Sequence, residues 1–316
     1  MAELLLAVIL AVVLDRLVPD RHGIKPFAWY RDWAESIEER FNGGKRSHGV
    51  GAVLVAMVPI VAGVFLLRYI LGEVGGWLRF LFDVFVLYLC LDVYRLGKVS
   101  GSISGSLEAG NVDEANDHFR ELSGKDAPER SEAGIARATV ETVLKQGNSL
   151  VISPIFWFLL FGPAGAIMQR LSCILDMLWG HRYERFAEFG WAAARFDDIL
   201  GWVPARVTAL SYALMGSFED ALHCWRRRIG VWSDINSGPL LASGLGALHM
   251  RSCEDVSEDH AYDENSGEGL IVIPDAGHVQ RVTALVWRVL VLWLAIGLLM
   301  SGADLWGRYA ERFMGG

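Results

Sequence analysis

The sequence has none of the short motifs that mark the common classes of soluble enzyme. It contains no Gly-x-x-x-x-Gly-Lys-Ser/Thr phosphate-binding loop, no Gly-x-Gly-x-x-Gly between a strand and a helix, no His-Glu-x-x-His and no Gly-x-Ser-x-Gly. Its four cysteines show no Cys-x-x-Cys spacing, so we interpret them as isolated thiols and predict neither a zinc site nor a disulfide framework. No basic stripe is present that would bind nucleic acid.

Acidic residues are abundant in only one part of the chain. There are 37 Asp and Glu against 29 Lys and Arg, which gives a net charge of −8. Eight of the acids lie in residues 252–280, a segment without Lys or Arg, and the rest of the chain is neutral. The negative charge therefore belongs to this acidic loop and not to the whole surface.

Charged residues make up only 21% of the chain, whereas hydrophobic residues make up 53% and the mean hydropathy is +0.31. Ordinary soluble domains have about 45–50% apolar residues. This composition excludes a disordered chain and a small disulfide scaffold, and it indicates a membrane protein that contacts the lipid bilayer. Because no strand-like alternation persists, the predicted fold is all-α. We expect one polytopic integral membrane helix bundle over residues 1–316, with helical cytoplasmic or interfacial loops.

Five segments are predicted to cross the bilayer, whose hydrocarbon core of ~30 Å needs about 20 apolar residues in a helix. They are residues 4–19, 49–67, 74–91, 146–169 and 282–303. Only the second and fourth are free of charged residues. Asp83 and Arg288 lie inside two of the others and mark candidate polar sites, because ionisable groups are costly in a membrane. A sixth segment, 199–218, is a candidate short or re-entrant span.

The loops between these segments predict the orientation. Loops 15–48 and 92–145 carry seven Lys and Arg each, so the positive-inside rule places both in the cytoplasm. The expected location is the bacterial inner (cytoplasmic) membrane, crossed several times. Two polar stretches are predicted to be helical, one starting at an Asn111 cap and one at Ser131.

The densest group of polar residues lies in residues 170–206, where Arg and Asp alternate with apolar residues. One interpretation is structural, with an Arg fork holding a carboxylate inside the bundle. In the other, the arginines bind an anionic phosphate or carboxylate while an aspartate binds magnesium or accepts a proton. Spacing alone leaves both open.

Several motifs in this region follow one another in a specific order. They are residues 162–166 (Gly-Pro-Ala-Gly-Ala), Arg170, Leu175-Asp176, residues 189–198 and residues 202–206, with shorter matches at 14–16, 49–51, 140–141, 154–156, 236–238 and 243–246. In this order and spacing they resemble the CobD/CbiB family of cobalamin biosynthesis, whose members are membrane-bound adenosylcobinamide-phosphate synthases. The AmpE proteins, membrane regulators tied to β-lactamase induction, resemble the same family in diverged form.

The resemblance implies an ATP- and magnesium-dependent amide ligation that joins aminopropanol or its phosphate to a carboxylate of cobyric acid. It implies an anionic or corrinoid ligand, and it assigns no metal ligand and no oligomeric state. The implied catalytic residues are Asp126, Asp176, Asp197 and Asp198. The implied substrate-binding residues are Lys125, Arg170, Arg195, Arg206 and Asn236.

Some family positions hold other residues in this chain. Where the synthases carry Glu-Asn…Asp-Gly, this sequence has Lys145, Gln146, Ser149 and Leu150. When several polar groups act together in catalysis, replacing some of them removes much of the activity of the whole group. Three functions are therefore considered: the synthase first, then an AmpE-like non-catalytic regulator of β-lactamase induction and cell-wall signalling, and then a transporter.

Overall fold

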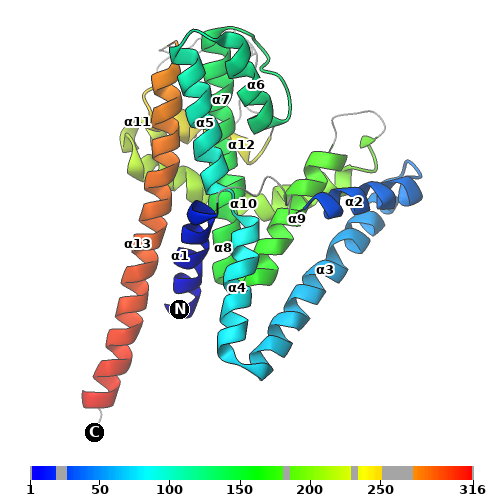
Figure 1. Cartoon of the computed structure of the whole chain (residues 1–316), viewed down its shortest axis with the longest axis vertical. Coiled ribbons are helices and arrows are strands. Elements are labelled where there is room, and N and C mark those ends of the chain that lie inside the picture. The colour runs from blue at the N-terminus through cyan, green and yellow to red at the C-terminus, as the bar shows by residue number, and fades with distance from the viewer. Residues whose placement is uncertain (1, 19–26, 181–185, 229–233, 251–272, 315–316) are drawn as a thin grey trace. The chain divides into compact units, whose positions relative to one another are not determined.

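The computed structural model describes residues 2–18, 27–180, 186–228, 234–250 and 273–314 (Figure 1). These residues form α-helices joined by short connections, with one π-helix and no strand among them. The all-α prediction is confirmed. The sequence predicts one domain, and the structure divides the chain into two compact units that interleave along it.

The first unit comprises Met1–Asp92, Ser153–Gly201 and Trp293–Gly316. Within it α1 packs on α4, α3 packs on α4 and α9, and α2 contacts both α3 and α9. Helices α3 and α4 form a hairpin (Figure 1). The helices that begin in this unit are α1 (Ala2–Leu17), α2 (Ala28–Phe41), α3 (Arg46–Val74), α4 (Gly76–Cys90), α8 (Ser153–Phe161), α9 (Pro163–Trp179) and α10 (Trp191–Met215).

The second unit comprises Val93–Ile152 and Trp202–Leu292. Its core is a helical cluster in which α5 packs on α6 and α7, and α12 packs on α7 and α11. Helix α12 is buried along its whole length, as expected for a helix of small and apolar residues only. The helices that begin here are α5 (Val93–Glu108), α6 (Val112–Ser123), α7 (Glu132–Gly147), the π-helix η2 (Asn148–Ile152), α11 (Phe218–Arg228), α12 (Ser237–Ala247) and α13 (Ala276–Met314).

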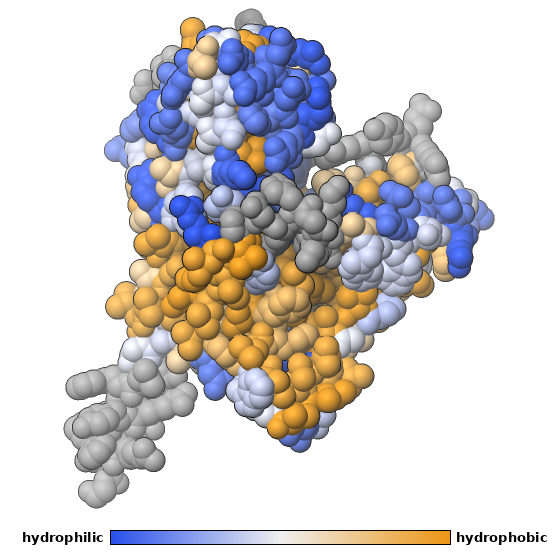
Figure 2. Space-filling view, in the orientation of Figure 1, coloured by the Kyte–Doolittle hydropathy of each residue, from blue (hydrophilic) through white to orange (hydrophobic). Residues whose placement is uncertain are grey.

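Three helical stretches are long and apolar enough to cross a membrane: Arg46–Val74, Glu132–Phe161 and Ala276–Ala303. Large apolar side chains such as Leu54, Phe65 and Phe85 stand exposed on α3 and α4, and Figure 2 shows an apolar surface over this hairpin. Soluble proteins rarely expose apolar patches of this kind. The protein is therefore a membrane protein whose apolar helices suit contact with lipid.

The predicted spans fit the helices unequally. Residues 49–67 lie inside α3 and 282–303 inside α13. Helices α1 and α4, which correspond to 4–19 and 74–91, have 16 and 15 residues and are shorter than the ~20 that a spanning helix needs. Most of 199–218 belongs to the 25-residue helix α10, which ends at Met215.

The predicted span 146–169 is interrupted at Gly162, after a helical stretch that runs through the end of α7, η2 and α8. Helix α8 ends at Phe161 and α9 begins at Pro163. Gly162 between them has a φ of 67°, a left-handed conformation that glycine adopts without steric cost. Pro163 lacks an N–H and suits the first position of a new helix. An uncharged run therefore contains a sharp helix boundary.

The candidate polar site at Asp83 is an ion pair between α3 and α4. Asp83 is 4% exposed. Its carboxylate accepts hydrogen bonds from Arg68 Nε at 2.8 Å and Arg68 Nη2 at 3.0 Å. A second pair, between Arg79 and Glu3 at 2.9 Å, is more exposed.

Two further expectations concern loops and cysteines. Of the predicted acidic loop 252–280, residues 252–272 lie outside the described residues, and α13 begins at Ala276. Cys90 and Cys173 are free thiols, but Cys224 is disulfide-bonded. The expectation of four isolated thiols is therefore wrong, because spacing in the sequence does not show which distant cysteines meet in the fold.

Candidate functional site

In the first unit, three of the predicted residues act electrostatically on one thiol. Arg170, Cys173 and Asp176 follow one another at three-residue spacing along α9, and Asp197 belongs to α10. Burial raises the pKa of the Cys173 thiol to about 12, Asp197 and Asp176 raise it further, and Arg170 opposes them. All three charged groups thus act electrostatically on the same thiol from α9 and α10. We call these four residues the α9 cluster.

Close glycine contacts support the α9 cluster. A Cβ atom on Gly180 would lie 2.8 Å from Asp176 Oδ1 and would overlap the Asp176 carbonyl oxygen. A Cβ atom on Gly190 would overlap the Trp179 carbonyl, and one on Gly49 would overlap the Phe189 carbonyl. The Trp179 and Phe189 rings meet edge to face, with centroids 5.3 Å apart. A larger residue at Gly180 would displace the backbone next to Asp176, and one at Gly190 or Gly49 would displace the backbone at Trp179 or Phe189.

Buried polar atoms on α9 point to a further role. Ser172 and Trp179 are each 1% exposed, and Ser172 Oγ, Trp179 Nε1 and Arg170 Nε have no hydrogen-bond partner among the described residues. Most buried polar atoms in native proteins do have partners. Helix α9 therefore carries hydrogen-bonding capacity that the described structure does not use.

Arg195 and Asp198 form a local pair on α10. Arg195 Nη1 lies 3.3 Å from Asp198 Oδ2, and the Arg195 side chain is 59% exposed. Exposed pairs at this spacing contribute little to stability. The structure thus places these two residues in a largely solvent-facing contact on α10.

Arg206, in the second unit, is held by its own helix. Its guanidinium lies 4.1 Å from the centroid of the Trp202 ring, and its Nη1 donates to the Trp202 carbonyl at 2.9 Å. A cation over an indole ring is a favourable contact.

Asp126 is the centre of a hydrogen-bonded loop after α6. Arg120, Arg130 and Asn116 all donate to its carboxylate, at 2.6–3.2 Å. These bonds, Arg120 first, hold the pKa of Asp126 at about 2. The neighbouring Lys125 donates its backbone N–H to Ser123 Oγ at 3.2 Å. Asp126 is therefore a carboxylate that is charged at neutral pH and has three partners, which suits it to fixing the loop and not to giving up a proton.

Asn236 lies at the start of α12. Its backbone N–H donates to Asp234 Oδ1 at 2.9 Å, and the Ser237 hydroxyl donates to the same carboxylate. Asp234 therefore fixes the turn into α12, and Asn236 occupies the N-cap position without a side-chain cap bond.

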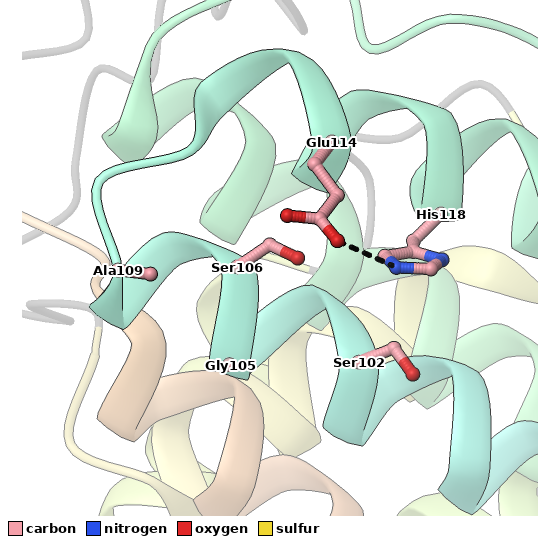
Figure 3. Close-up of a pocket in the computed structure, with 6 residues that line it drawn as sticks. All are labelled: Ser102, Gly105, Ser106, Ala109, Glu114 and His118. Atoms are coloured by element: carbon pink, nitrogen blue, oxygen red, sulfur yellow. Dashed lines mark ion pairs between the residues drawn. The ribbon is translucent and has the colours of Figure 1, made fainter.

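A small polar cavity between α5 and α6 was not predicted from the sequence (Figure 3). It has a volume of about 290 Å³, and its lining includes Ser102 and Ser106 from α5 and Glu114 and His118 from α6. His118 Nε2 lies 3.9 Å from Glu114 Oε1. Two four-residue spacings, Ser-x₃-Ser and Glu-x₃-His, are the signal that could have indicated it. No group of three metal-binding side chains occurs here or elsewhere in the described part of the chain.

Known proteins that are similar to this chain belong to the family that the sequence motifs resemble. A model of the CobD/Cbib protein family matches residues 8–296. The chain is 37% identical to the cobalamin biosynthesis protein CobD of Stutzerimonas stutzeri strain A1501, over 94% of this chain and 97% of that protein. A protein of the same name from Chromobacterium violaceum is 31% identical, over 92% and 94% of the two chains. One from Rhodobacter capsulatus is 28% identical, over 89% and 90%. No solved structure matches this chain.

Proposed function

The chain belongs to the CobD/Cbib protein family, and on this premise we propose that it is a cobalamin-biosynthesis protein of the bacterial inner membrane, crossed by several of its helices. Its activity is that of an adenosylcobinamide-phosphate synthase: it joins the amine of aminopropanol or its phosphate to a carboxylate of cobyric acid. The observation that supports this activity is the α9 cluster, where one arginine and two aspartates act electrostatically on Cys173.

The residues of this cluster suit the groups that such a ligation handles. The Arg170 guanidinium binds the negative charge of a carboxylate or phosphate. The reacting amine must lose protons as the amide forms, and a neighbouring aspartate, Asp176 or Asp197, accepts one. Trp179, three residues after Asp176 on α9, packs edge to face against Phe189.

Magnesium and ATP belong to the proposed activity, and the side chains of the cluster fit them. No group of three potential metal ligands lies among the described residues, so a metal held by protein alone is not supported. Magnesium, however, binds through one or two carboxylates together with substrate phosphates. Asp176 and Asp197 are the carboxylates that would hold it, beside Arg170 for the phosphates. When bound, ATP supplies the activation of the corrinoid carboxylate.

Genetic complementation tests this proposal. The full chain is expressed in a strain that lacks the synthase, cobyric acid is supplied, and cobalamin-dependent growth is measured. We expect growth with the wild-type chain, and at least a hundredfold lower synthesis in isolated membranes for Asp176→Asn or Asp197→Asn. Asp113→Asn, an exposed aspartate of α6, is the matched control and should retain activity. If the wild-type chain is present in the membrane but does not restore growth, the proposed synthase activity is contradicted.

The alternative is an AmpE-like non-catalytic membrane regulator, and one observation favours it. Two positions that are acidic in the synthases hold Lys145 and Ser149 here. Gln146, in the same motif, donates to the Leu122 carbonyl at 2.8 Å and so serves a structural contact. Loss of several polar groups from one motif weakens catalysis more than the fold. Failed complementation with normal membrane expression would support this alternative.

A further inference from the structure

Tyr30 is a fully buried tyrosine whose hydroxyl has no hydrogen-bond partner among the described residues. It lies on α2 between Trp29 and Trp33, with ring centroids 5.8 and 6.1 Å away. A buried hydroxyl without a partner costs free energy, and a phenylalanine would fill the same space without that cost. The hydroxyl therefore indicates a group that binds here in another state of the protein.

The surroundings of Tyr30 include the arginine of the α9 cluster. Phe27 is the N-cap residue of α2 and precedes Tyr30 by three residues. The Phe27 ring lies 5.8 Å from the Arg170 guanidinium, and α2 packs on α9. Arg170 Nε is also a buried donor without a partner among the described residues. Two unused donors, one neutral and one charged, thus lie on the packed helices α2 and α9, and Phe27 at the start of α2 contacts the charged one.

Another buried tyrosine shows what an ordinary structural hydroxyl does in this protein. Tyr212 is as fully buried as Tyr30, and its hydroxyl donates to the Leu144 carbonyl at 2.8 Å. Burial raises the pKa of Tyr30, so its phenol stays protonated and acts as a donor at neutral pH. The contrast separates a tyrosine that holds two helices together from one whose donor is left for a ligand.

We propose that the Tyr30 hydroxyl and the Arg170 Nε–H are donors of a phosphate-binding site between α2 and α9. A phosphate group presents several acceptor oxygens and a negative charge, which matches a site that supplies donors and a guanidinium. Tyr30 is then a residue that positions a phosphate-bearing substrate. This inference rests on the proposed function in one respect, since it takes the phosphate to come from ATP or from phosphorylated aminopropanol.

The test uses the full chain in detergent and measures thermal unfolding during titration with inorganic phosphate. Acetate serves as the carboxylate comparison. We expect phosphate to raise the Tm of the wild type and acetate to have little effect. Tyr30→Phe should unfold at the same or a higher temperature without ligand, and its Kd for phosphate should rise roughly ten- to a hundredfold. Separate titrations with magnesium-ATP and with aminopropanol phosphate then identify which source loses affinity in Tyr30→Phe.

Tyr212→Phe is the matched control, and it should unfold at a lower temperature while keeping the wild-type Kd for phosphate. The proposal is overturned if Tyr30→Phe binds phosphate as the wild type does, if the wild type binds none, or if acetate binds equally well. Complementation separates this outcome from failure of the proposed function. If the wild-type chain rescues growth but Tyr30→Phe keeps the wild-type Kd for phosphate, only the phosphate site is refuted. If phosphate binding depends on Tyr30 but the wild-type chain does not rescue growth, only the proposed ligation is refuted.

Discussion

The ion pair between Arg68 and Asp83 should make one of the largest single contributions to the stability of the first unit. Two parallel bonds, at 2.8 and 3.0 Å, join α3 to α4. A Cβ atom on Gly162 would lie 3.5 Å from the Arg68 guanidinium, so the boundary between α8 and α9 lies against the same group. The pair therefore fixes the hairpin and the helix break together.

The structure allows an estimate of how much the free energy of unfolding falls when the Arg68–Asp83 ion pair is removed. Removing one partner of a buried pair typically costs about 3–5 kcal/mol, because the other charge is left without compensation. The Asp83 side chain is 6% exposed but that of Arg68 is 32% exposed, so we expect Asp83→Asn to cost about 3 kcal/mol, near the lower end. Glu3→Gln breaks the more exposed pair with Arg79 and should cost about 0–1 kcal/mol.

Thermal unfolding in detergent provides the measurement, with membrane yield as a second readout. Asp83→Asn should lower the Tm by roughly 5 °C or more, and Glu3→Gln by a degree or two. Replacing both Arg68 and Asp83 by leucine should recover most of the loss, because no unpaired charge remains. Equal shifts for Asp83→Asn and Glu3→Gln would refute the reasoning, as would a double variant that is no more stable than Asp83→Asn.

Two other predictions concern ionisable groups outside the membrane-spanning helices. The pKa of Asp126 is about 2 in the folded protein, against an ordinary value of 3.8 for the unfolded chain, so its stabilising effect is present above pH 4 and is lost as the pH falls towards 2. Asp126→Asn should therefore lower the Tm at pH 6 and converge with the wild type near pH 2; an equal difference at both pH values would contradict this. Cys173, with its thiol pKa raised to about 12, should react with iodoacetamide at pH 8 at least a hundredfold more slowly than glutathione, as measured by mass spectrometry; a similar rate would show that the thiol is not shielded.

The elements that the sequence could predict are those that depend on local signals. The long apolar runs become α3 and α13, and the Ser131 hydroxyl accepts the Gly134 N–H at 3.0 Å, as expected for an N-cap. The other expected cap does not form, since Asn111 donates to the Glu114 side chain instead. Local chemistry thus predicts where a helix starts more reliably than which atom its cap residue contacts.

The features that the sequence could not predict depend on partners distant in the chain. In the sequence, Asp83 is a single charge in an apolar segment, and only the structure shows that Arg68 lies opposite it. In the sequence, Cys173 is an isolated thiol, whereas in the structure Asp197 from another helix raises its pKa. Arg195 and Asp198 lie near Asp197 in sequence, yet they pair with each other at the surface. Helical spacing identifies a shared face, whereas only packing shows which face is buried.

The buried polar groups divide into two classes that bear on function. One class holds helices together, as Thr208 does by donating to Asn148 at 2.9 Å and Tyr212 by donating to Leu144. The other class has no partner among the described residues and includes Tyr30 on α2 and Arg170 Nε on α9. Unsatisfied groups reduce stability, so a fold keeps them where a ligand provides the missing bond. Arg170 belongs to the α9 cluster and Tyr30 lies on α2, which packs on α9, so both unsatisfied groups occur on packed helices of the first unit.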